Sequence, residues 1–150
     1  MRLFVRAYRW RRIDPVPWSP LNKPLGQCRL GLVSSAGLVA PDQAGFDSGV
    51  SGGDASYRAI SDNITVGTLV DTHRSESYDH SGIVEDPNLA FPIDRVHELA
   101  QAGRIGSVNR RHLTFMGSII TTGRLIRETA PQAAQLFVED RVDVALLVPV

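Results

Sequence analysis

The fold is set by two apolar stretches of the sequence, CRLGLVSS at residues 28–35 and VDVALLVPV at residues 142–150. Each is a short, continuous run of aliphatic residues, a pattern typical of buried strands in a parallel sheet. The first run ends in Ser34 and Ser35. Because segments just beyond the carboxyl ends of strands build the ligand site of open α/β sheets, both serines are candidate site residues.

The segments between these two strands predict an α/β domain. A helix is expected after Pro92, because Asp94 favours its N-terminal end, apolar residues recur on one face and Gly103 supplies a stop. Three further segments carry strand or helix signals, namely strands at 64–70 and 104–108 and a helical region at about 119–140 that is interrupted before Pro131. Residues 36–62, rich in Gly, Ser and Asp, are expected to form a long loop. We therefore predict an α/β fold with a mainly parallel open sheet and flanking helices, incomplete at its C-terminus.

Composition and charge limit the class of protein. The chain has 150 residues, of which 43% are hydrophobic, with 16 basic and 16 acidic side chains, so it can form one domain with a sizeable core. The charge balance argues against a nucleic-acid binder, and no apolar run approaches the roughly 18 residues of a membrane-spanning helix. Cys28 is the single cysteine, and the apolar run near the N-terminus is too short for a signal peptide, so we expect a cytoplasmic protein. Residues 1–24 are expected to form an Arg- and Pro-rich arm, and residues 25–150 the α/β domain.

Three more residues are candidates for chemistry at the sheet edge. Arg58 could hold a substrate carboxylate in a bidentate pair, with an ordinary loop salt bridge as the alternative. His73 follows the second expected strand directly, and imidazole titrates near neutrality, although a structural or solvated histidine is an equal possibility. His112 follows the third expected strand and could face the same edge.

Two other motifs give little support to a specific chemistry. Residues 49–53 match G-x-S-x-G with Ser51 at the nucleophile position, but no strand is expected before them, so a serine hydrolase is only a minor alternative. Metal-binding atoms gather within ten residues, on Asp71, His73, Glu76, Asp79 and His80. Their spacing matches no zinc pattern such as H-E-x-x-H, and we expect no metal site.

A series of short stretches, spread from about Trp18 to the last residue, carries a family resemblance. The stretches are GDASYR at 53–58, TH at 72–73, YD at 78–79, DPNLAFPIDR at 86–95, ELA at 98–100 with Gly103, IG at 105–106, FMG at 115–117, VD at 142–143 and LL at 146–147. The string FPIDR is the most specific of them. Together they resemble the selenoprotein B subunits of the glycine, sarcosine, betaine and D-proline reductase family, with the proline-reductase type closest.

The resemblance implies the N-terminal portion of a reductase subunit that cleaves the carbon–nitrogen bond of glycine, betaine, sarcosine or D-proline. In that family the strand corresponding to residues 144–150 is followed at once by a redox-active selenocysteine or cysteine. The resemblance therefore implies a redox residue directly after Val150, and a chain that is truncated and inactive by itself. A non-catalytic α/β binding module, or a decayed relative, is the alternative.

The resemblance also implies partners. A pyruvoyl group on a partner subunit would capture the amine of the small substrate, and a thioredoxin-like dithiol would supply electrons. No nucleic acid or membrane is implied. Five residues would then be candidates for binding the substrate carboxylate or handling protons, namely Ser34, Ser35, Arg58, His73 and His112.

Overall fold

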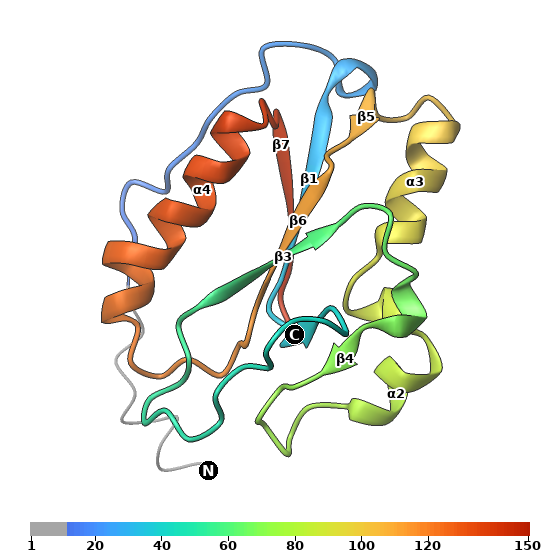
Figure 1. Ribbon diagram of the computed structural model, residues 1–150. Helices are drawn as coiled ribbons and strands as arrows, with labels where there is room; N and C mark the ends of the chain where they lie inside the picture. Colours follow the sequence, from blue (N-terminus) through green and yellow to red (C-terminus); the bar gives the residue numbers. More distant parts are fainter. Residues whose placement is uncertain (1–11) are drawn as a thin grey trace.

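The computed structural model describes residues 12–150, which form a five-stranded sheet with helices on both faces (Figure 1). The central strand β1 (Arg29–Ser34) pairs in parallel with β7 (Val144–Val148) on one side. On its other side it pairs in parallel with β5 (Ser107–Val108) and then β6 (Arg111–Phe115). The sheet ends in β3 (Tyr57–Ser61), which runs antiparallel to β6. These pairings confirm the predicted α/β fold with a mainly parallel sheet.

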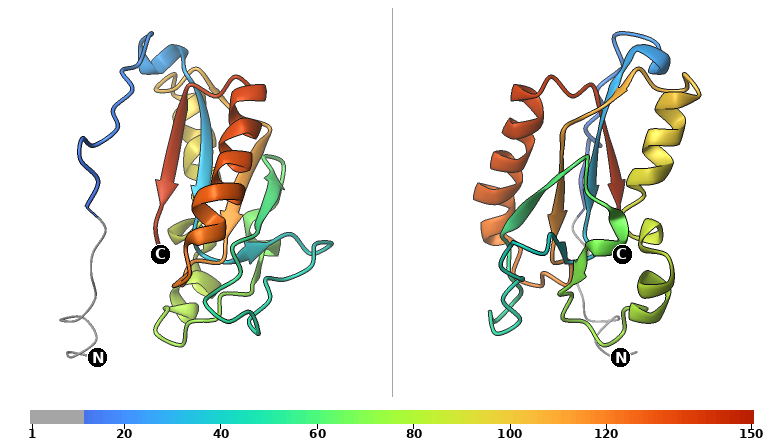
Figure 2. Two further views of the ribbon diagram at one scale, coloured as in Figure 1. Left: turned by 90° about the vertical axis from the view of Figure 1, so that its left-hand side faces the viewer. Right: turned by 45° about the vertical axis from the view of Figure 1, so that its right-hand side comes forward.

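Helices cover the two faces of the sheet. On one face lies α4 (Ala130–Glu139), which continues from a π-helical turn, η4 (Leu125–Thr129). On the opposite face lies α3 (Ile93–Gln101) (Figure 2). The smaller elements are β2 (Leu38–Val39), which pairs with β4 (Val70–Asp71), the helix α2 (His80–Glu85), and the 3-10 turns η1 (Leu25–Gln27), η2 (Val66–Thr68) and η3 (Pro87–Leu89). None of the helices within residues 12–150 has the length and apolar character to cross a bilayer.

The part of the expected arm before residue 12 lies outside the described residues. From residue 12 to residue 24 the chain contains neither helix nor strand, and every side chain is exposed. The division into an arm and a domain therefore stays a prediction.

Side chains of β1 alternate between the two helix layers, as the period of a strand requires. Val33 packs with Leu113 and Phe137 beneath α4, and Leu30 packs with Val96 of α3. Gly31 faces α4, where a Cβ atom would lie 2.8 Å from the Phe137 ring. The absence of a side chain at this position lets α4 lie close to the sheet.

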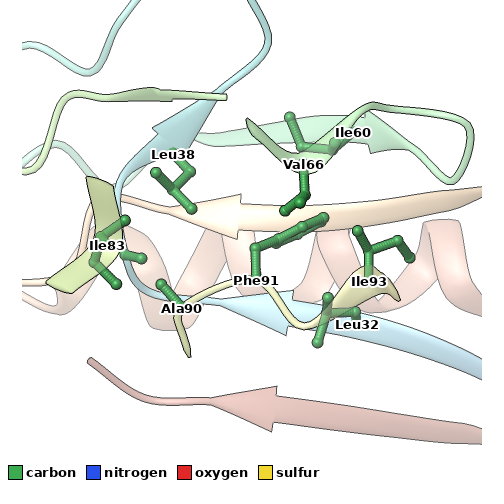
Figure 3. Close-up of a cluster of buried hydrophobic side chains, with 9 residues drawn as sticks. Leu32, Leu38, Ile60, Val66, Ile83, Ala90, Phe91 and Ile93 are labelled. Atoms are coloured by element: carbon green, nitrogen blue, oxygen red, sulfur yellow. The ribbon is translucent and has the colours of Figure 1, made fainter. Parts of the chain in front are cut away.

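The main core lies between β1, β3 and the segment that leads into α3. Phe91 is at its centre and is fully buried, with Leu32, Ile60 and Val66 around it (Figure 3). Phe91 directly precedes Pro92, the N-cap of α3, and Ile93 and Val96 of that helix are buried as its predicted apolar face requires. The FPIDR string therefore joins the core to the start of α3.

Several expected elements differ in the structure. The strand expected at 64–70 is replaced by η2 and the two-residue β4, because the turn at 62–63 and Gly67 direct Val66 into the core instead of along a strand. The expected loop at 36–62 contains β2 and β3, whose buried Ile60 pairs opposite His112. The strand expected at 104–108 is shortened to β5, and it is followed by β6.

The terminal elements differ in detail as well. The helical region expected at 119–140 begins at residue 123, and it continues through Pro131 without a break. Pro131 is the second residue of α4, and the π-helical turn η4 lies immediately before α4. β7 is parallel to β1 as expected, but it lies at the sheet edge and Leu147 is 67% exposed, so it is not the fully buried strand that its composition predicts.

The core assignment is tested by truncating Phe91. Phe91→Ala should lower the free energy of unfolding by about 3–5 kcal/mol, because a fully buried aromatic ring is lost and a cavity remains. Leu89→Ala, two residues away at a side chain that is 64% exposed, should change it by less than about 0.5 kcal/mol. Urea titration of both variants measures the difference, and equal losses would contradict the assignment.

Candidate functional site

The carboxyl ends of β1, β6 and β7 meet at one edge of the sheet, because the three strands are parallel. Ser35 follows β1 directly, and its N–H donates to the carbonyl of Val148 at 3.1 Å. The Ser35 hydroxyl oxygen also accepts a hydrogen bond from the Val150 N–H at 2.9 Å. Ser35 therefore holds the end of β7 beside the end of β1.

A pocket of about 360 Å³ opens beside this edge. Its lining is almost wholly apolar and comes from the strand ends, from the segment after β6 and from the start of the α4 layer. Ser35, Gly117 and Pro149 are among its lining residues at the strand ends. Apolar surface next to a few convergent polar groups is the usual character of a small-molecule site.

His73 reaches the same edge between two glycines. Gly37 and Gly117 both have positive φ, 67° and 68°. A Cβ atom on Gly37 would lie 2.9 Å from the backbone nitrogen of His73. A Cβ atom on Gly117 would lie 2.9 Å from the His73 Nε2 and would collide with the Ser35 carbonyl. Because Gly117 has no side chain, the His73 ring and the Ser35 carbonyl can both lie close to its backbone.

The hydrogen bonds of His73 define its protonation. Its Nδ1 accepts from the Ser75 N–H at 3.1 Å, so the ring proton of the neutral form lies on Nε2. Nε2 is buried and has no hydrogen-bond partner within the described residues. Burial lowers the pKa of His73, and the nearby Asp71 carboxylate only partly offsets this effect. His73 is therefore a neutral imidazole with an unused N–H donor at the sheet edge.

Two rings and a carboxylate surround His73. The Tyr78 ring stacks on it with centroids 4.3 Å apart, and the Tyr78 hydroxyl is also buried, with no hydrogen-bond partner among residues 12–150. Burial raises the pKa of Tyr78 to about 12, so the phenol is neutral. His80 lies beyond Tyr78 and is paired with Asp71 at 2.5 Å. Although sequence reasoning noted Asp71 and His80 as possible metal ligands, it did not identify this hydrogen-bonded cluster, because no spacing rule encodes it.

The other predicted site residues have side chains turned elsewhere. The Ser34 hydroxyl is buried and donates to the Ala90 carbonyl at 2.7 Å. The Arg58 guanidinium donates to the carbonyls of Ala44 and Gly45 and lies 4.4 Å from the Phe46 ring centroid. Both side chains therefore support the backbone of the fold in this structure. Of the five predicted residues, Ser35 and His73 are the two that the structure brings together at the sheet edge.

His112 lies inside β6, not after a strand as expected, and it faces the core. Its Nδ1 accepts from the Leu32 N–H at 3.0 Å, and its ring meets the edge of Phe91. It is fully buried, and this burial lowers its pKa to about 4. His112 is therefore a neutral core histidine that ties β6 to β1.

Two motifs noted in the sequence do not form the sites that they would require. Ser51 is exposed in a turn, without the strand and helix that a nucleophile elbow requires. No group of three or more His, Cys, Asp or Glu side chains that could hold a metal ion is found within residues 12–150.

The chain is similar to known reductase subunits. Residues 2–149 match the family described as glycine/sarcosine/betaine reductase selenoprotein B (GRDB). The D-proline reductase subunit gamma of Acetoanaerobium sticklandii is 32% identical over 136 residues, which cover 90% of this chain and 54% of that protein. The sarcosine reductase complex component B subunit beta of Peptoclostridium acidaminophilum is 24% identical over 147 residues, which cover 96% of this chain and 33% of that protein. The chain thus spans about half the length of the first relative and a third of the second, and no solved structure matches it.

The buried state of His112 predicts a pH dependence of stability. Its folded pKa, about 4, lies below its ordinary value of 6.5, so the unfolded chain takes up a proton between these pH values while the folded chain does not. Stability from this group is fully present above pH 6.5 and is lost as pH falls toward 4, by about 3 kcal/mol. Urea titration of wild type and His112→Gln at pH 7.5 and pH 5 measures the contribution of His112 to the free energy of unfolding, because the other groups contribute equally to both proteins. Parallel pH profiles of the two proteins would contradict a neutral buried His112.

Proposed function

Because the chain belongs to the glycine/sarcosine/betaine reductase selenoprotein B family, we propose that it forms the substrate-facing part of a subunit that reductively cleaves a carbon–nitrogen bond. One observation carries the proposal. The neutral His73 presents a buried, unpartnered Nε2–H at the same sheet edge where Ser35 binds Val150. This is the edge at which the family resemblance expects the redox-active residue to follow.

The reaction requires electrons and protons in balance. Breaking the carbon–nitrogen bond of a small amino acid or amine consumes two electrons and two protons, one proton for the carbon and one for the departing nitrogen. A dithiol, which becomes a disulfide, would supply the electrons. A selenocysteine or cysteine after Val150 would supply the nucleophile, and a pyruvoyl carbonyl on a partner subunit would hold the substrate amine.

The residues of this chain would do three things in that reaction. Ser35 fixes the backbone at Val150 through its hydroxyl, and so fixes where the following residue begins. The pocket that Gly117 and Pro149 help to line has a lining that excludes water from the reacting carbon. His73 carries a hydrogen on Nε2, and we assign to this N–H a hydrogen bond to the substrate carboxylate. The dithiol, on becoming a disulfide, would release the two protons that the reaction consumes.

D-proline and sarcosine are the first substrates to test. The relatives are named as subunits of D-proline reductase and of a sarcosine reductase complex, and the former is the more similar of the two. Glycine and betaine complete the set of amines that the family description covers or the resemblance implies. All four are small zwitterions, and we place the enzyme in the cytoplasm, where a dithiol donor stays reduced.

The assay is amine-dependent oxidation of a dithiol by the full-length subunit together with its partner subunit. We expect turnover with at least one of the four amines, and an abolished rate when the residue after Val150 is changed to alanine. Absence of turnover with all four amines, or unrelated sequence in place of a selenocysteine or cysteine codon after Val150, would refute the proposal and favour a non-catalytic module.

His73→Ala should lower kcat/KM by about 10-fold or more, because a hydrogen bond to a charged group contributes about 1.5–3 kcal/mol. His97→Ala is the matched control, because His97 lies on α3 and bonds the Asp62 carbonyl away from this edge. It should change kcat/KM less than about 2-fold. An unchanged kcat/KM in His73→Ala would remove His73 from the reaction.

A further inference from the structure

We propose that His80 is a positioning residue for His73: paired with Asp71 as a cation, it cancels the carboxylate charge and so keeps His73 a neutral Nε2–H donor. The inference rests on the proposed function for its catalytic meaning. Its physical content, the charge state of two histidines, stands on the contacts of the loop from Asp71 to His80.

Both ring nitrogens of His80 face acceptors. Nδ1 meets the Asp71 Oδ2 at 2.5 Å, and Nε2 meets the Ser75 carbonyl at 3.1 Å. A carbonyl oxygen cannot donate, and the second oxygen of Asp71 already accepts the N–H of His73 at 2.8 Å. Both nitrogens of His80 must therefore carry hydrogen, which makes the ring an imidazolium. The bond to Asp71 is also the largest of the effects that raise the pKa of His80.

Asp71 and Ser75 each contact both histidines. Asp71 accepts from the backbone of His73 and from the ring of His80. Ser75 donates its N–H to the ring of His73 and offers its carbonyl to the ring of His80. Asp71, His73, Ser75 and His80 form a closed hydrogen-bonded cycle. In this cycle the His73 ring can only accept at Nδ1, whereas the His80 ring can only donate.

The charge of Asp71 is the reason that His80 is needed. An uncompensated carboxylate this close would raise the pKa of His73 and so work against the lowering by burial. His80 supplies the compensating positive charge, with the neutral Tyr78 ring between the two histidines. Tyr78 touches both rings, at 4.3 Å and 4.8 Å between centroids, and adds no charge of its own.

The remaining charged groups near the cycle are engaged elsewhere. Arg74 donates to the carbonyls of Val50 and Ser118, and its charge also disfavours a cation at His73. Asp79 caps α2, where it accepts from the N–H of Gly82 and from the hydroxyl of Ser81. Burial is the largest cause of the low pKa of His73, and His80 helps to keep that pKa low by compensating the charge of Asp71.

The test is a double-mutant cycle read by NMR of the histidine ring nitrogens in the labelled full-length subunit. His80→Gln leaves the Asp71 charge uncompensated and should raise the pKa of His73 by about 1 unit. Asp71→Asn keeps an oxygen for the His73 N–H and should leave that pKa low. The double variant should return the pKa of His73 to the wild-type range, a reversal that mere loss of structure would not give. His97→Gln should leave it unchanged.

Two results would overturn the inference. One is an unchanged pKa of His73 in His80→Gln. The other needs no variant, and is a neutral His80 ring in the wild-type protein at pH 7. Both results are read from histidine protonation and not from turnover, so this inference and the proposed function can fail independently. If the double-mutant cycle gives the expected pKa values and His73→Ala loses activity, both stand. If it gives those values while His73→Ala retains full activity, only the substrate-binding role of His73 falls.

Discussion

Strand β1 is hydrogen-bonded to parallel neighbours on both sides, and this pairing determines where the groups of the site lie. Its register with β7 runs from Leu30 opposite Val144 to Ser34 opposite Val148, so the two strands end together. Neighbouring strands lie about 5 Å apart, which brings the chain after β1 within hydrogen-bonding reach of the chain after β7. Ser35 meets Val150 for this reason. Backbone pairing within the sheet therefore sets the positions of the strand ends, and the side chains of the site make their contacts at those positions.

The chemistry of the site depends on histidines in different environments. His112, inside the sheet, and His73, between two glycines, are both neutral because burial disfavours their charged forms. His80, partly exposed and bonded to a carboxylate, is charged. Environments that separate the protonation states of like groups are a common way for one site to hold both a neutral hydrogen-bond donor and a fixed charge. In this protein the two states occur within one short loop.

The sequence predicted the elements whose signals are local and left out those that tertiary contacts decide. The aliphatic runs at β1 and β7 and the capped, one-sided pattern of α3 were sufficient to predict a mainly parallel α/β sheet. β3 lies in a segment rich in Gly and Ser that carries no strand signal. The segment of η2 has the composition of a strand, but Val66 leaves the strand path to enter the core. For the site, a single residue decides the outcome: Ser34 is the last residue of β1 and faces the core, whereas Ser35 has left the strand and faces the edge. His73 was identified by its place after a strand, but its cycle with Asp71 and His80 follows from loop geometry that no pattern of residue types specifies.

The two halves of the site differ in the chain entropy needed to form them. The histidine cycle closes over residues at most nine apart, whereas the bond between Ser35 and Val150 joins residues 115 apart. The entropy of closing a loop rises with the logarithm of its length, so the longer closure costs about 2 kcal/mol more. The hydrogen bonds of the cycle therefore involve only a short stretch of chain, while the Ser35 contact requires β1 and β7 to have paired. The burial that keeps His73 neutral depends on Gly37 and Gly117, so the finished site needs both the short loop and the distant parts of the chain.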